Sequence, residues 1–198
     1  TGVQTCALPI SNGTFDHYVW GTALRNVKAE FLLEGTKIKL SKLTGTDGES
    51  GTLSGHGEFI LDKDLNYQVN FELNKARLIK IDEAEAIGSG QLVVSGSKNK
   101  TSINGMIALE RTTLSIPKKI PEVLEAVPIH YVNQKENESP PTPARHDSLM
   151  EAPIDFHIDL KTERPVLILH DDLYSEWRGH ALIEGKGDKP VVNGELKL

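Results

Sequence analysis

Histidine is the side chain in this sequence best suited to acid–base or metal chemistry, so the seven histidines are considered first. They are spread along the chain, at His17, His56, His130, His146, His157, His170 and His180. No two of them have the HxH or HExxH spacing that would bring two imidazoles to one metal ion. His157 lies between acidic residues on the polar side of an alternating segment, so we expect its side chain to be solvated.

The other candidates for chemistry are equally isolated. His170 precedes Asp171 and Asp172, but three consecutive residues of an extended chain cannot all point at one ion, so we interpret them as a turn. Ser115 and Ser148 lack the Gly-x-Ser-x-Gly context of a hydrolase nucleophile. The sequence has neither a Gly-rich phosphate loop nor a CxxC pair. We therefore expect no enzyme activity, no metal and no cofactor.

Charge and composition exclude further classes of function. The 198 residues include 22 basic and 28 acidic side chains, a net charge of −6. This balance argues against nucleic acid as the partner, because phosphate contacts need clustered Lys and Arg. No apolar run is longer than that of Val166–Leu169, which is far shorter than the roughly 20 residues of a transmembrane helix. Aromatic residues make up only 6% of the chain, which is low for a core built on a few large side chains.

The first ten residues, Thr1–Ile10, differ from the rest and resemble translated sequencing-adapter read-through. We interpret residues 1–10 as a non-native segment; the alternative is an ordinary irregular N-terminus. The segment contains Cys6, the only cysteine, which cannot form a disulfide within the chain. Because the chain lacks an initial methionine and stops within a strand-like pattern, we expect a fragment of a longer protein.

The elements that position these side chains are predicted to be strands. Between Ala23 and Ile116, apolar residues recur at every second position, most clearly in 65–74, where a strand would place them on one face. Turn-forming segments separate the runs, at 44–50, 62–64 and 97–100. The spacing predicts an antiparallel meander of long strands, and glycines within them indicate a strongly curved sheet.

Proline and glycine divide the chain into two regimes. No proline occurs from Gly21 to Ile116, and no glycine from Met106 to Arg178. Residues 134–152 are rich in proline and charge, which is typical of a flexible linker; residues 121–127 have room for one or two helical turns before it. We predict that 11–133 form the first part of a curled sheet and that its strands resume over 153–198.

The apolar side of these strands must be covered by another sheet, a helix or a ligand. The pattern alone leaves two arrangements open: a β-sandwich with a filled core, and an all-β, elongated, curled antiparallel sheet around an apolar groove able to hold acyl chains. The residues predicted to line such a groove are Leu53, Phe59, Leu61, Leu65, Tyr67, Val69, Phe71, Leu73, Leu92, Val94, Ile103, Ile107, Leu109, Ile154, Phe156, Ile158, Leu160, Trp177, Ala181 and Ile183.

From about Phe31 to Leu198 the sequence resembles the C-terminal region of the TamB family of translocation and assembly module proteins, in the AsmA-like superfamily. The matching motifs occur in the family's order, at Gly51–Gly57, Leu65–Asn74, Ser89–Gly96, Gly105–Leu109, Ser115–Pro117, Ile154–Leu160 and Glu176–Gly179. One departure is the stretch His170-Asp171-Asp172, because the family usually has glycine before its Leu-x-x-Glu-Trp motif.

The resemblance implies a periplasmic β-taco, an elongated sheet curled around an apolar groove, with a Pro-rich insertion. It implies a Gram-negative bacterium, anchoring in the inner membrane through an N-terminal segment absent from this chain, and an Omp85-type outer-membrane barrel partner resembling TamA. The expected ligands are phospholipid acyl chains, and the expected function is phospholipid movement between the two membranes with support of outer-membrane protein assembly. The alternatives are a module that accepts β-strands of outer-membrane barrel proteins and a β-rich structural passenger domain.

Overall fold

The chain folds into one all-β sheet. The computed structural model describes residues 5–116, 154–170, 173–186 and 190–198, and no helix occurs in these ranges. Every strand belongs to the same sheet. The strands are β1 Thr5–His17, β2 Thr22–Glu34, β3 Lys37–Thr46, β4 Thr52–Ile60, β5 Asn66–Lys80, β6 Ala84–Ser97, β7 Lys100–Ser115, β8 Ile154–Thr162, β9 Val166–His170, β10 Leu173–Lys186 and β11 Val191–Lys197.

Some predicted segments fall wholly or partly outside the described ranges. The predicted linker over 134–152, the helical turns over 121–127 and the Asp171–Asp172 part of a turn all lie there. Thr5–Ile10, within the segment interpreted as non-native, form the start of β1 and pair with β2; the origin of residues 1–10 stays a prediction. Within the described part of the chain, no helix is long and apolar enough to span a bilayer.

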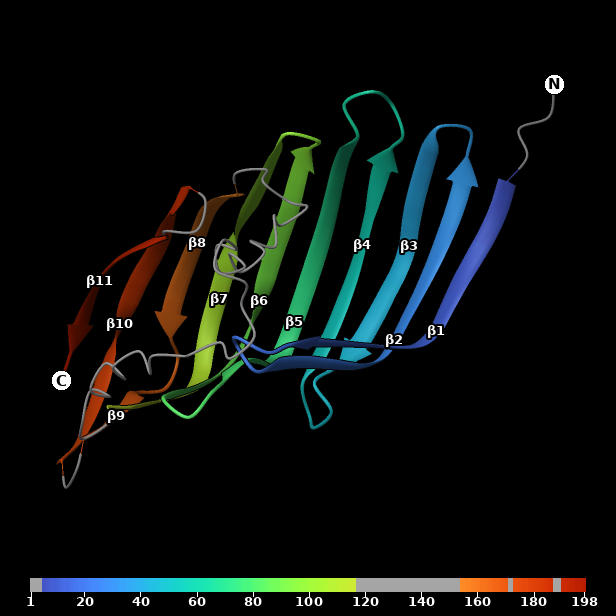
Figure 1. Ribbon diagram of the computed structural model, residues 1–198. Coiled ribbons are helices and arrows are strands. Elements are labelled where there is room, and N and C mark those ends of the chain that lie inside the picture. Colours follow the sequence, from blue (N-terminus) through green and yellow to red (C-terminus); the bar gives the residue numbers. More distant parts are fainter. Residues whose placement is uncertain (1–4, 117–153, 171–172, 187–189) are drawn as a thin grey trace, which may run out of the picture.

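The strand order follows the chain. Strands β1 to β7 each pair antiparallel with their sequence neighbours, which confirms the predicted meander (Figure 1). One junction is different, because β8 and β9 both run parallel to β7. A parallel pair needs a connection of a dozen or more residues, and the stretch 116–153 is long enough to supply it. Strand β10 then pairs antiparallel with β8, β9 and β11.

A line of backbone irregularities crosses the sheet, and we call this line the crease. Asn12, Asn26 and Lys75 have positive φ angles of 59°, 52° and 50°. Each lies at a register shift with the neighbouring strand, which is the geometry of a β-bulge. In the β6–β7 ladder, the register shift lies between Ile87 and Gly88. Because a bulge bends its strand and increases its twist, bulges in register bend the whole sheet along one line.

Some strands end at the crease, and others continue beyond it. The β3–β4 hairpin stops there, whereas β1 and β2 continue past it and reach the far end of β5 (Figure 1). The Lys80 N–H donates to the Trp20 carbonyl at 2.9 Å, and the Thr22 hydroxyl donates to the Leu78 carbonyl at 2.7 Å. On the other side, β8 ends and β9 begins at the same level along β7. The sheet is therefore curled, as predicted.

The packing of this sheet is open. No described side chain is less than 2% exposed, and the buried apolar residues are few: Ala29, Leu40, Val69, Leu73, Ala76, Ala86, Ile107 and Val166. No second sheet covers the strands in the described ranges. The filled β-sandwich is thus not the arrangement found.

Candidate functional site

The predicted lining residues that lie in strands share one side of the sheet, which we call the apolar face. Phe71 is paired with Leu92 across β5 and β6, and Ile158 with Ile183 across β8 and β10. Directly paired residues point to the same side. Such rows place on the apolar face the predicted residues Leu53, Phe59, Tyr67, Val69, Leu73, Val94, Ile103, Ile107, Leu109, Ile154, Phe156, Leu160, Trp177 and Ala181.

Two predicted lining residues lie outside the strands. Leu61 follows β4 and is 44% exposed, and Leu65 precedes β5 and is 39% exposed. The reason is the turn between them: Asp62 Oδ1 accepts the amide N–H groups of Asp64 at 3.0 Å and Leu65 at 2.7 Å. Leu65 has a φ of 50° and belongs to this turn, so the alternating pattern of β5 begins one residue later than predicted.

Packing on the apolar face forms two clusters. Around Val69, the buried residues Ala29 and Leu40 contact partly buried neighbours, and around Leu73 the buried Ala76 and Ile107 do the same. The sequence prediction missed several of these side chains, namely Ala29, Phe31, Leu40, Leu43, Ala76 and Leu78. The alternation of Ile38 and Leu40 was the signal for β3, whereas the bulge at Lys75 concealed Ala76 and Leu78.

Glycines on the apolar face lie opposite large side chains. Gly90 is paired with Leu73 on one side and Ile107 on the other. A Cβ atom on Gly90 would lie 2.1 Å from the Met106 carbonyl oxygen, which no real side chain could tolerate. Glycine is therefore required at this position by the close approach of β6 to β7, and the large neighbours Leu73 and Ile107 cover the space beside it.

The opposite face of the sheet carries the polar residues. A hollow of about 430 Å³ over β3, β4 and β5 is lined by Lys39, Leu40, Ser41, His56, Gly57, Glu58, Gln68 and Asn70. His157 is exposed on this side, as predicted, and its Nδ1 lies 3.2 Å from Glu184 Oε1. Among the described residues, no three His, Cys, Asp or Glu side chains are placed to hold a metal ion.

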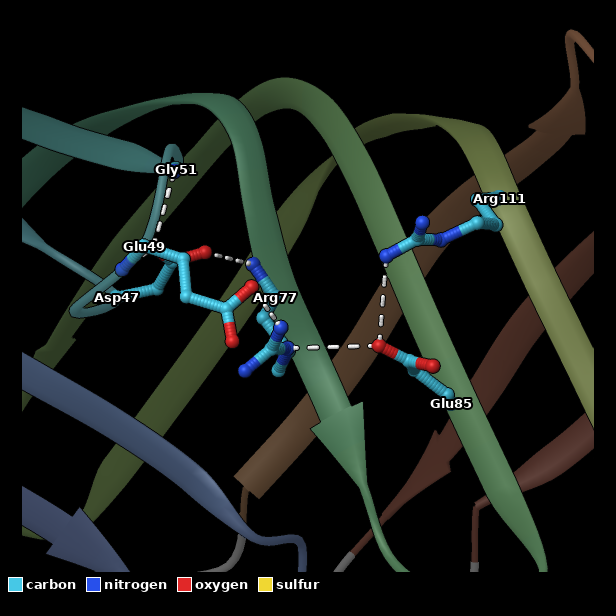
Figure 2. Close-up of polar contacts among 6 residues, drawn as sticks. All are labelled: Asp47, Glu49, Gly51, Arg77, Glu85 and Arg111. Atoms are coloured by element: carbon cyan, nitrogen blue, oxygen red, sulfur yellow. Dashed lines mark hydrogen bonds and ion pairs between the residues drawn. The ribbon is translucent and has the colours of Figure 1, made fainter.

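A polar cluster fastens the crease on this opposite face, and sequence reasoning missed it (Figure 2). Asp47, in the β3–β4 turn, accepts the N–H groups of Glu49 and Gly51 through Oδ1, both at 2.9 Å. Its Oδ2 accepts the Arg77 backbone N–H of β5 at 3.2 Å. Because the hairpin ends here, the Asp47 carboxylate replaces the strand partner that the Arg77 amide would otherwise lack.

The Arg77 side chain extends this cluster toward β6 and β7. Its guanidinium hydrogen-bonds to Glu49 and its Nε lies 3.6 Å from Glu85 Oε1, which is also 3.5 Å from Arg111 (Figure 2). The hydrogen bond and charge of Arg77 hold the pKa of the Glu49 carboxyl below its ordinary value. The same hydrogen bond raises the pKa of Arg77. These contacts fix backbone geometry and bring together no nucleophile with a base.

A family model described as "TamB C-terminal domain" matches residues 41–198. This range contains most of β3 and all of β4 to β11, and so most of the apolar face. No curated protein and no solved structure matches the chain.

Proposed function

Since the chain belongs to the TamB C-terminal domain family, we propose that it is a segment of a TamB-like bacterial envelope protein whose apolar face binds phospholipid acyl chains. In this proposal the curled sheet forms an open groove, and acyl chains slide along it between the inner and outer membranes. The head groups remain in water at the open side.

The observation that carries this proposal is the continuity and partial exposure of the apolar face. Rows of aliphatic residues run from β4 through β8 to β10, yet side chains such as Leu92 and Ile158 remain only partly buried. Removing apolar surface from water contributes about 25 cal/mol per Å², so an acyl chain lying on these rows is stabilised. Movement along a uniform lining requires no particular side chain, which agrees with the isolated histidines and serines of this sequence.

Family membership supports the rest of the proposal. We infer a periplasmic location in a Gram-negative bacterium, anchoring in the inner membrane by a segment outside this chain, and a TamA-like barrel of the Omp85 type as partner. We also propose support of outer-membrane protein assembly as part of the function, and a role that involves no catalysis.

Photo-crosslinking in cells tests lipid binding on the apolar face. A photoreactive phenylalanine analogue replaces Phe71 in one variant and Glu72 in another, because these neighbours point to opposite faces of β5. Of the two, Glu72 is exposed and Phe71 is partly buried. We expect phospholipid adducts from position 71 and few from position 72. Equal adducts at the two positions, or none at either, would overturn the proposal.

A second candidate function is acceptance of a β-strand from a barrel protein. The observation that favours it is β11, which is exposed at every position from Val191 to Lys197 and has β10 as its one described neighbour. An open strand edge is a template for another strand. Crosslinks from Val192 to an outer-membrane barrel that persist after the lipid is stripped would favour this function, and their absence would count against it.

A further inference from the structure

At one end of the strands, beyond the crease, apolar and aromatic side chains are exposed to solvent. We call this end the aromatic edge. It consists of the β1–β2 turn with Tyr18, Val19 and Trp20, the β5–β6 turn with Ile81, and the start of β10 with Leu173 and Tyr174. Backbone hydrogen bonds join these pieces along the edge. Lys80 N–H donates to the Trp20 carbonyl at 2.9 Å, Ser115 N–H to Glu83 at 2.8 Å, and Ile116 N–H to Leu169 at 2.8 Å.

The exposure of this edge is greatest at the hairpin tip. Tyr18 is 92% exposed, Val19 75% and Trp20 51%, and no charged residue lies between His17 and Arg25. The turns at the opposite ends of the strands are charged instead, with Asp62, Lys63 and Asp64 in one turn and Lys98 in another. The tip of the β1–β2 hairpin therefore presents different chemistry to its surroundings from the charged turns at the opposite ends of the strands.

We propose that the aromatic edge docks on the interface of a lipid bilayer, with the side chains of Tyr18, Val19 and Trp20 inserted among the head groups. Tyr and Trp combine an apolar ring with a polar atom, and for this reason they are enriched where membrane meets water. This proposal goes beyond the groove, because it concerns the turns at one end of the strands and not the apolar face.

The area of the tip favours a bilayer over a protein partner. An aromatic side chain buries roughly 150–250 Å², so Tyr18 and Trp20 together fall short of the about 800 Å² per partner of a stable protein interface. Side chains as exposed as these have few neighbours to hold them in one position. The fluid interface of a bilayer therefore accommodates them better than the rigid surface of a protein. The charges beside the tip are mixed, since Lys80 is followed by Asp82 and Glu83. We therefore expect apolar insertion with little dependence on salt.

Tryptophan fluorescence tests the proposal directly. The chain has two tryptophans, so the variant Trp177→Phe leaves Trp20 as the sole indole. Vesicles of phosphatidylethanolamine and phosphatidylglycerol are added, with and without brominated acyl chains. We expect a blue shift of the Trp20 emission and its quenching by the brominated lipid, both retained at high salt. Replacing Tyr18 and Val19 by Ser in this background should weaken vesicle partitioning about tenfold.

A matched control uses apolar residues at the other end of the strands. Leu61 and Leu65 are 44% and 39% exposed, and replacing both by Ser in the same background should leave partitioning unchanged. Circular dichroism confirms that each variant keeps its strands. An absent blue shift, an equal loss in the control, or concentration-dependent dimerisation through the tip without vesicles would overturn the proposal. A failure to crosslink lipid at Phe71 would refute lipid binding on the apolar face but not docking of the aromatic edge. The two proposals can therefore be refuted independently.

Discussion

The carboxylate of Asp47 holds the crease together, and the substitution Asp47→Ala tests this most directly. Three backbone N–H groups donate to this carboxylate, those of Glu49, Gly51 and Arg77. The Arg77 amide matters most, because it belongs to β5 and lies where the β3–β4 hairpin has ended. Without the carboxylate, the link between the hairpin turn and the neighbouring strand is lost.

The size of the effect follows from these contacts. A hydrogen bond to a charged group contributes about 1.5–3 kcal/mol, and less where water can replace it. The Glu49 amide is exposed and regains water, whereas the contacts to Gly51 and Arg77 are partly buried. Two contacts of about 1.5 kcal/mol each predict a loss of about 3 kcal/mol in the free energy of unfolding, measured by urea denaturation. Asp47→Asn should lose about half as much, because its amide keeps one acceptor oxygen but turns an N–H₂ group toward Arg77.

Asp62 provides the matched control. Its Oδ1 accepts two amides within its own exposed turn, those of Asp64 and Leu65, and it contacts no other strand through these bonds. Asp62→Ala should therefore cost less than about 1 kcal/mol. In addition, hydrogen exchange at the Arg77 amide should accelerate in Asp47→Ala and stay unchanged in Asp62→Ala. Equal losses of stability in the two variants, or unchanged exchange at Arg77, would refute the assigned role of Asp47.

Two further predictions concern the apolar face and the crease cluster. Leu73→Ala should lower the free energy of unfolding by about 3 kcal/mol, because Leu73 is 8% exposed, whereas Leu65→Ala at 39% exposure should change it by no more than about 0.5 kcal/mol; similar losses would contradict the assignment of Leu65 to the turn. In the folded chain, Arg77 lowers the pKa of Glu49. The ionised Glu49 therefore adds to the free energy of unfolding above its unfolded pKa of about 4.3, and this stabilisation is lost as the pH falls through the pKa of the folded chain. The stability difference between wild type and Glu49→Gln should therefore shrink below about pH 4, and a constant difference from pH 7 to pH 3 would count against the pair.

Alternation predicted the strands well wherever the backbone was regular. Tyr67, Val69, Phe71 and Leu73 lie on the apolar face as the period of two required, because one face of β5 packs and the other meets water. The pattern failed beyond Leu73, where the bulge adds one residue and reverses the alternation. Asparagine is enriched at positive φ and marks such positions in β1 and β2, but at Lys75 the residue type carries no such signal.

The other features that the sequence did not predict arise from contacts between distant parts of the chain. The parallel pairing of β7 with β8 joins Thr101 to Ile154, and no local pattern records which neighbour a strand selects. The crease cluster was missed for the same reason. Asp47 was recognised as part of a turn, but its bond to Arg77 depends on where the β3–β4 hairpin stops relative to β5. Sequence periodicity therefore predicts which face a residue occupies more reliably than it predicts where a strand bends.

The agreement between strand order and chain order from β1 to β8 makes this architecture a molecular ruler. Each strand adds about 4.8 Å across the sheet, so inserting one more hairpin lengthens the molecule by about 10 Å and leaves the pairings on either side unchanged. Span is then set by counting hairpins, independently of their exact side chains. Under the proposed function as a bridge between two membranes, homologous chains that span gaps of different width are expected to differ by whole hairpins.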